Sequence, residues 1–265
     1  MQQRKPKLGQ NFLVDDAARH RIADALGDVS TRTVIEIGPG HGAITTILAE
    51  RSGRLVCIEL DRALAAELRF RFRNHANVEI VEADVLQVDL SGLVPEGDRA
   101  LAVGNLPYYI TSNILMHLFE HNVALELAVV MMQREVADRV AAEPGTRDFG
   151  LLSATAQMYA GTSQLFTLPP AAFQPPPDVY SSVLRLNFRP RFQELGIADR
   201  RGFDRFLKHC FQQKRKTLSN NLRSAGYSSA QIAAACADAE TEPGIRAEAL
   251  TLESFARIYL ALTAA

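Results

Sequence analysis

The feature that most constrains the fold is a regular alternation of short apolar runs and amphipathic segments between residues 33 and 133. The apolar runs are rich in β-branched residues, which favours buried strands, and the segments between them have helical periodicity. The predicted strands are residues 33–37, 54–60, 78–83, 101–104 and 125–132, and the predicted helices are residues 41–51, 61–74 and 112–121. Asp61 is of a residue type that caps helix N-termini. This alternation predicts a parallel sheet with helices on both faces.

The pattern changes beyond residue 132. Residues 134–142 and 151–159 have the periodicity of helices, and residues 182–188 alternate as a last strand would. Residues 168–179 contain five prolines. Because proline has no backbone N–H to donate, this stretch cannot be a helix or a central strand, and we expect a stiff extended loop.

Beyond Pro190 the strand signals disappear. Helical periodicity without intervening strands covers residues 200–213, 216–223, 229–238 and 250–262. The sequence therefore predicts two domains, an α/β domain over residues 1–190 and a small all-helical domain over residues 191–265.

Composition excludes several classes of protein. The three cysteines are far apart and have no ligand spacing with histidine, so we expect no metal site. The basic N-terminus has no apolar run behind it, which argues against a secretory signal. No apolar stretch approaches the roughly 18 residues of a membrane span. We expect a cytoplasmic protein with no membrane partner.

A glycine-rich turn, Glu36-Ile37-Gly38-Pro39-Gly40, joins the first predicted strand to the first helix. Glycines there let the backbone approach a ligand closely. The spacing also matches the dinucleotide fingerprint, with Glu59 at the end of the second strand as the ribose-binding acid. Because NAD and S-adenosylmethionine both contain ribose, these residues alone leave both cofactors open.

The third and fourth strands carry more specific signals. Asp84 follows the third strand, where a carboxylate can accept a bond from an adenine amino group. Asn105-Leu106-Pro107-Tyr108 follows the fourth strand, at the edge where open α/β sheets bind ligands. Together with the glycine turn and Glu59, this order of residues favours S-adenosylmethionine.

The Asn105–Tyr108 segment is suited to holding a planar amino group for methylation. The side-chain carbonyl of Asn105 and the backbone carbonyl of Leu106 or Pro107 can accept both N–H bonds of an exocyclic amine. Pro107 stiffens the turn, and Tyr108 offers a flat face for stacking. Such a site needs in-line placement of the reactants and requires neither a metal nor a nucleophilic side chain.

Several motifs resemble those of the ribosomal RNA adenine N6,N6-dimethyltransferase family over nearly the whole chain. They are KLGQNFL at residues 7–13, EIGPG at 36–40, Glu59, Asp84, NLPY at 105–108, FQPPPDV at 173–179 and KRKTLSNNL at 214–222. The resemblance implies a Rossmann-like S-adenosylmethionine-dependent methyltransferase sheet with a helical C-terminal domain. It also implies dimethylation of two adjacent adenosines in the 3′-terminal hairpin loop of 16S ribosomal RNA, within an immature small subunit.

The resemblance and the strand-end pattern together assign the candidate site. The residues expected to bind the cofactor are Gln10, Asn11, Leu13, Gly38, Gly40, Glu59, Leu60, Asp84, Val85 and Asn105. The residues expected to hold the target base are Asn105, Leu106, Pro107, Tyr108 and Phe173. Phe173 would supply the second stacking ring, fixed by the prolines after it.

Basic residues gather on the predicted helical domain although the chain has a net charge of −1. Residues 185–223 contain eleven Lys or Arg and three Asp or Glu. Such a basic face is expected where a protein contacts a phosphate backbone. The residues expected to contact RNA are Arg4, Lys5, Lys7, Lys208, Lys214, Arg215, Lys216 and Arg223. We expect the protein to act as a monomer.

Three alternatives remain open at this stage. The same chemistry on 23S ribosomal RNA would make a macrolide-resistance enzyme, although the 214–222 motif and the form of the proline loop favour the small subunit. A ribosome-assembly checkpoint factor would bind the immature subunit, with methylation secondary. An NAD oxidoreductase would use the glycine turn differently.

Overall fold

The computed structural model describes residues 11–264 and divides them into two compact units. The sheet unit comprises residues 11–137 and Thr162–Phe188, and the helical unit comprises Asp138–Gly161 and residues 189–264. No helix of the described residues is long and apolar enough to cross a membrane.

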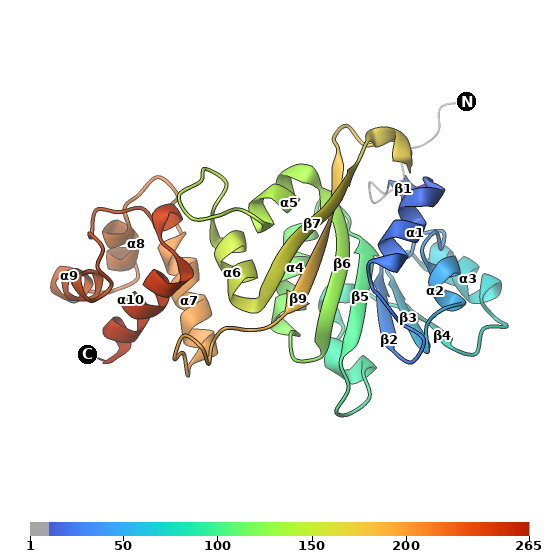
Figure 1. The fold of residues 1–265 in the computed structure, drawn as a ribbon, viewed down its shortest axis with the longest axis horizontal. Coiled ribbons are helices and arrows are strands. Elements are labelled where there is room, and N and C mark those ends of the chain that lie inside the picture. Colours follow the sequence, from blue (N-terminus) through green and yellow to red (C-terminus); the bar gives the residue numbers. More distant parts are fainter. Residues whose placement is uncertain (1–10, 265) are drawn as a thin grey trace. The chain divides into compact units, whose positions relative to one another are not determined.

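The sheet unit is built on a seven-stranded sheet with the order β4-β3-β2-β5-β6-β9-β7 (Figure 1). The strands are β2 (Thr33–Ile37), β3 (Arg54–Glu59), β4 (Val78–Glu82), β5 (Ala100–Asn105), β6 (Leu125–Gln133), β7 (Ala160–Leu168) and β9 (Ser181–Phe188). Strands β2 to β6 run parallel, and β9 pairs antiparallel with β6. The six predicted strands are confirmed, whereas β7 was not predicted.

Helices cover both faces of this sheet, as the alternation predicts. They are α1 (Asp16–Asp24), α2 (Thr45–Ala49), α3 (Arg62–Arg71) and α4 (Thr111–Glu120), with short 3-10 turns η1 (Val85–Gln87) and η2 (Leu90–Leu93). The chain moves outward from β2 through β3 to β4 on one side, and from β5 to β6 on the other. Right-handed crossovers therefore place α2 and α3 on one face and α4 on the opposite face.

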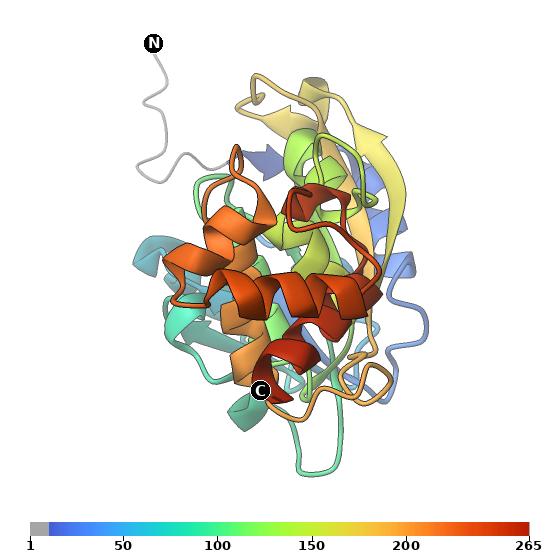
Figure 2. The same ribbon diagram turned by 90° about the vertical axis from the view of Figure 1, so that its left-hand side faces the viewer.

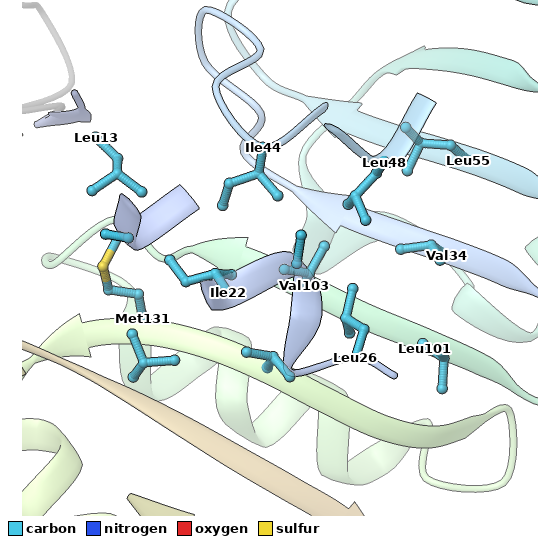
Figure 3. Close-up of a cluster of buried hydrophobic side chains, with 14 of the residues drawn as sticks. Leu13, Ile22, Leu26, Val34, Ile44, Leu48, Leu55, Leu101, Val103 and Met131 are labelled. Atoms are coloured by element: carbon cyan, nitrogen blue, oxygen red, sulfur yellow. The ribbon is translucent and has the colours of Figure 1, made fainter. Parts of the chain in front are cut away.

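A large cluster of apolar side chains lies beneath α1 and α2. Figure 3 shows Ile22 of α1 and Leu26, which follows this helix, over Val34, Leu101 and Val103 of the central strands. Each of these five side chains is at most 4% exposed. Burying a side chain of this size contributes roughly 1.5–3 kcal/mol, so the cluster fixes the two strands whose ends carry the glycine turn and Asn105.

The helix predicted over residues 41–51 is shorter in the structure. Helix α2 begins at Thr45, and residues 41–44 form turns. Gly40 and Gly42 have φ values of 58° and 79°, a left-handed conformation that an α-helix cannot contain. The helix can therefore begin only after both glycines.

The proline-rich segment is less uniform than the predicted extended loop. It contains one 3-10 turn, η3 (Pro170–Ala172), and a two-residue strand, β8 (Phe173–Gln174), before a cis Gln174–Pro175 peptide bond. Strand β8 pairs antiparallel with β1 (Phe12–Leu13), outside the central sheet. Pro170 is tolerated in η3 because the first residues of a helical turn need no N–H partner.

The helical unit contains α6 (Leu151–Tyr159), α7 (Arg200–Cys210), α8 (Leu218–Ser224), α9 (Ser229–Asp238), η4 (Ala247–Ala249) and α10 (Leu252–Ala264), and α5 (Arg134–Val140) spans the boundary between the units. Helices α9 and α10 pack together and are drawn in orange and red in Figure 2. The chain passes between units after Phe188, near the predicted boundary, but residues 138–161 pack with the helical unit instead of the predicted N-terminal domain. Packing of α6 against α7 and α10, which no local pattern reveals, accounts for this difference.

Candidate cofactor and substrate cavity

The carboxyl ends of β2 and β5 open into a cavity of about 500 Å³. The strand order reverses between these two neighbouring strands, and open α/β sheets bind ligands at such a point. The volume is in the range of small-molecule sites, roughly 300–1,000 Å³. The predicted residues that line it are Asn11, Leu13, Gly38, Gly40, Glu59, Leu60, Asp84, Val85, Asn105, Leu106, Pro107 and Tyr108. Gln10 lies outside the described residues.

The glycine turn forms one wall of the cavity and requires glycine for two reasons. Gly40 has a φ of 58°, which residues with a Cβ rarely adopt. A Cβ built on Gly40 would also lie 2.9 Å from the ring of Phe12, closer than van der Waals contact allows. The backbone N–H of Gly40 donates to Glu59 Oε2 over 3.1 Å, which ties the turn to the end of β3.

Glu59 is a buried carboxylate at the end of β3. Its side chain is 2% exposed, and its second oxygen accepts the Asp61 N–H over 2.9 Å. Burial raises the pKa of Glu59, and the two N–H donors only partly offset that rise. Because each carboxylate oxygen has two lone pairs, both can still accept a bond from a hydroxyl group.

Asp84 and Val85 lie two and three residues beyond the end of β4. The Asp84 side chain accepts the Leu86 N–H over 3.0 Å and so caps η1. The capping role and the lining of the cavity are compatible, since a carboxylate has further acceptor sites.

The Asn105 side chain is held by a segment far away in the sequence. Its amide nitrogen donates to the Asn11 backbone carbonyl over 2.8 Å. This bond uses the donor end of the amide, so the side-chain oxygen is the end that remains for a ligand. The orientation required for accepting an amine N–H is therefore already set.

The backbone after Asn105 distinguishes between the two predicted carbonyl acceptors. The Pro107 carbonyl already accepts the Thr111 hydroxyl at 2.9 Å and the Ile110 N–H at 3.2 Å. Two bonds occupy both of its lone pairs. Leu106, whose N–H donates to the Met131 carbonyl, has its own carbonyl left as the second acceptor.

The two predicted stacking rings lie in different environments. Tyr108 lines the cavity, half-buried, and its hydroxyl is 2.7 Å from Ser181 Oγ, which fixes the ring. Phe173 is 3% exposed, belongs to the hydrophobic core cluster and is not among the lining residues. The structure therefore does not bring Phe173 to the cavity, because pairing of β8 with β1 turns this residue into the core.

Many residues that line the cavity were not predicted for the site, and four of them are Phe12, Glu36, His41 and Tyr109. Phe12 packs on Gly40 and lies 4.4 Å from the ring of His41, and Tyr109 lines the cavity with 59% of its surface exposed. Glu36 lines the cavity with 2% exposure. The sequence carries a signal for it, since Glu36 is the only charged residue of β2 and lies two residues before Gly38 of the glycine turn.

The predicted RNA-contacting side chains of the helical unit are exposed. Lys216 and Arg223 line a separate hollow of about 450 Å³ with Gln213, Asn220 and Ser224. Lys214 donates to the Arg147 backbone carbonyl over 2.8 Å. Within residues 11–264, Lys208, Arg215, Lys216 and Arg223 form no ion pair. Arg4, Lys5 and Lys7 lie outside the described residues.

The described part of the chain contains no group of three or more His, Cys, Asp or Glu that could hold a metal ion. The polar side chains that line the cavity are carboxylates, amides, imidazoles, hydroxyls and the guanidinium groups of Arg19 and Arg71. Such a site can bind and orient an organic ligand.

Comparisons with known proteins agree with this geometry. The family model of ribosomal RNA adenine dimethylases matches residues 1–264. A protein of Acidobacterium capsulatum named ribosomal RNA small subunit methyltransferase A is 58% identical over 97% of this chain and 91% of its own length. Among solved structures, a dimethyladenosine transferase from Plasmodium falciparum has a TM-score of 0.77 at 22% identity over 96% of this chain and 98% of its own.

A second solved structure, the 23S rRNA methyltransferase ErmE, has a TM-score of 0.69 at 26% identity and covers 96% of this chain and 100% of its own. The Plasmodium structure supports the fold. The family model and the Acidobacterium relative show the family. The chain belongs to the ribosomal RNA adenine dimethylase family.

Proposed function

We propose that this protein transfers methyl groups from S-adenosylmethionine to N6 of two adjacent adenosines in the 3′-terminal hairpin loop of 16S ribosomal RNA. Its membership of the adenine dimethylase family supports the reaction class. The small-subunit substrate is supported by the name of a relative that is 58% identical.

The two buried acids of the cavity support this cofactor, whereas the arginines that also line it, Arg19 and Arg71, already donate to backbone carbonyls of the chain. Glu36 and Glu59 are both buried at its wall, and within the described residues neither forms an ion pair with a cation. S-adenosylmethionine carries one net positive charge, whereas NAD would bring two negative phosphates toward these carboxylates. A buried carboxylate without a partner raises the free energy of the folded protein. A cationic ligand would offset this unfavourable charge, whereas an anionic ligand would add repulsion to it.

The observation that carries the proposal is the bond between the Asn105 amide and the Asn11 carbonyl. It leaves the Asn105 side-chain oxygen and the Leu106 carbonyl as acceptors for the two N–H bonds of one amino group. The adenine amine is a poor nucleophile because its lone pair is delocalised into the ring. Two acceptors on its hydrogens favour the pyramidal and more nucleophilic form of the nitrogen.

The bound cofactor supplies an electrophilic methyl group on a positively charged sulfur. The remaining task of the chain is placement, which can lower a barrier by roughly 7–11 kcal/mol. Tyr108, fixed through Ser181, provides a face for the target base. A base in a duplex must be flipped out to reach such a pocket, and stacking contributes about 1–3 kcal/mol per base.

The substrate is a partly assembled small subunit in the cytoplasm, and the protein acts as a monomer. The exposed cations around the second hollow, Lys216 and Arg223, contact the phosphate backbone of its RNA. Lys208, Lys214 and Arg215, which are also exposed, extend this contact.

Two other functions lead to different observations. A 23S rRNA methyltransferase, as ErmE is, would modify large subunits. A checkpoint factor would support assembly without turnover.

The test incubates the protein and radiolabelled methyl donor with immature small subunits and, separately, with large subunits. Label and dimethyladenosine in the 3′-terminal hairpin of 16S RNA are the expected result, with none after Asn105→Ala. Label in 23S RNA would replace the proposal by the first alternative. Normal assembly in cells carrying Asn105→Ala, together with no label in vitro, would favour the second.

A further inference from the structure

Two buried acids, Glu36 and Glu59, line the cavity, and within residues 11–264 neither forms an ion pair with a cation. Glu36 lies on β2 and Glu59 at the end of β3, and each is 2% exposed. Two carboxylates that are both ionised and buried close together would repel each other and lose their hydration. One of them is therefore expected to carry a proton at neutral pH in the absence of a ligand.

The surroundings identify Glu36 as that acid. Burial, with a smaller contribution from the charge of Glu59, raises the pKa of Glu36 from 4.5 to about 7. Glu59, in contrast, accepts two backbone N–H bonds, from Gly40 and Asp61, which favour its ionised form.

The groups around Glu36 are neutral donors and acids. On β3, the Cys57 thiol lies 3.6 Å from Glu36 Oε2, and burial with the nearby acids raises the pKa of Cys57, so it stays a neutral donor. On α2, the Thr45 hydroxyl is fully buried and has no hydrogen-bond partner among the described residues. Thr45 and Cys57 both favour the ionised form of Glu36. These donors can stabilise the carboxylate once a positive ligand makes ionisation favourable.

We propose that Glu36 holds a proton in the empty cavity and releases it when the positively charged methyl donor binds. This inference rests on the proposed cofactor. The O–H bond of the Glu36 carboxyl breaks, the proton passes to solvent, and no electrons are transferred. The empty protein thus avoids a second buried charge, and the bound donor gains a counter-charge.

Proton release can be measured separately from catalysis. Donor binding is followed by isothermal titration calorimetry at one pH in several buffers of different ionisation enthalpy. Because Glu36 is expected to titrate near pH 7 in the empty protein, wild-type protein should release most of a proton per donor at pH 6, less at pH 7 and almost none at pH 8.5. The dissociation constant should therefore decrease, by up to about tenfold per pH unit, as the pH rises from 6 to 7.

Glu36→Gln keeps the size of the side chain and cannot release a proton, so its binding enthalpy is expected to be independent of the buffer. The matched control is Glu67→Gln. Glu67 is 3.2 Å from the ring of His41, which also lines the cavity, so Glu67→Gln changes a second acid near the donor site and leaves Glu36 in place. It is expected to release protons as the wild type does. Proton release that persists in Glu36→Gln would overturn the proposal.

A second measurement needs no variant. In protein labelled with ¹³C at the glutamate carboxyl carbons, one resonance is expected to titrate near pH 7 without donor and to stay at the ionised position at pH 6 with saturating donor. A Glu36 signal that is already ionised at pH 6 in the empty protein contradicts the inference. Failure of the wild type to bind any donor would contradict the proposed cofactor, whereas binding with buffer-independent heat contradicts only the role of Glu36.

Discussion

The cavity of the sheet unit and the basic surface of the helical unit use polar side chains in opposite ways. In the cavity, Asn105, Glu59 and Tyr108 are half-buried or buried, and each is held by a hydrogen bond within the chain. On the helical unit, Lys216 and Arg223 are exposed and, within residues 11–264, form no ion pair. Placement of atoms requires groups whose positions are set in advance, whereas attraction of a polyanion requires only charges that can move to meet it.

This contrast predicts different responses to mutation. A change in the cavity removes one specific geometry and has a large effect on a single step. A change on the basic surface removes one of several similar charges and has a small effect that depends on salt.

The largest effect is expected for Asn105→Ala. It removes an acceptor aimed at the reacting amine, and loss of one such preorganised group typically costs about 10²–10³-fold in kcat. Donor affinity is expected to change by less than about tenfold. Single-turnover methylation and equilibrium dialysis measure the two quantities.

Asn77→Ala is the matched control for Asn105→Ala. Asn77 also donates its side-chain amide to backbone carbonyls, those of Ala49 and Ser52, but it does not line the cavity. The Asn77→Ala variant is expected to have a lower free energy of unfolding and an unchanged kcat. Equal loss of kcat in both variants would mean that Asn105 is structural.

The second effect concerns the pH dependence of stability. Since the folded state raises the pKa of Glu36 to about 7, it binds a proton that the unfolded state has lost. Stability of the empty protein therefore falls as pH rises from about 4.5 to about 7, by up to about 3 kcal/mol for this group. Glu36→Gln is expected to remove that fall, measured by urea unfolding at a series of pH values.

Glu126→Gln provides a control of opposite sign. The Arg32 side chain, 2.7 Å away, lowers the pKa of Glu126, so this exposed pair stabilises the fold at neutral pH and weakens as pH falls. Its replacement is expected to have a small effect, since exposed ion pairs contribute about 0–1 kcal/mol. If Glu126→Gln changed the pH dependence of the free energy of unfolding more than Glu36→Gln does, the buried acid would not be the one that dominates this dependence.

Gly40→Ala tests the shape of the cavity wall. The alanine would have to keep a left-handed φ, and its methyl group would push the Phe12 ring away. We expect this to cost about 1–3 kcal/mol of folding free energy. Donor affinity is expected to fall about 10- to 100-fold, by calorimetry. Gly97→Ala has a similar φ of 85° with no atom within 4 Å, so it should destabilise the fold without weakening donor binding.

The smallest effect is expected for the double change Lys216→Ala and Arg223→Ala. Subunit binding should weaken several-fold, and the slope of log affinity against log salt should decrease by about 1.5–2. The control is Arg257→Ala, an exposed arginine on α10 outside the hollow. An unchanged salt slope in the double variant would remove this surface from the RNA site.

Periodicity and strand-end chemistry were sufficient to predict most of the sheet unit. A buried strand appears in the sequence as a short apolar run followed by a glycine or polar residue. The ends of β2, β3 and β5 and their site residues could therefore be predicted from short windows of sequence. Strand β7 was missed because its exposed edge carries Thr, Ser and Gln and lacks a clear apolar alternation.

Contacts between distant segments could not be predicted in the same way. The bond from Asn105 to Asn11 spans 94 positions, and Phe173 enters the core through pairing of β8 with β1. The pKa of Glu36 also depends on Cys57 and Thr45, which lie on other elements. Each of these results from tertiary packing, which a local sequence window does not contain.

The Asn11 carbonyl has a consequence for the way such sites are mapped. It belongs to the main chain, so replacing the Asn11 side chain by alanine leaves this oxygen in place. A survey that truncates one side chain after another would rank position 11 by its amide alone and overlook the contact that orients Asn105. Replacing the peptide linkage after Asn11 with an ester, whose carbonyl is a weaker acceptor, is the kind of change that would expose it.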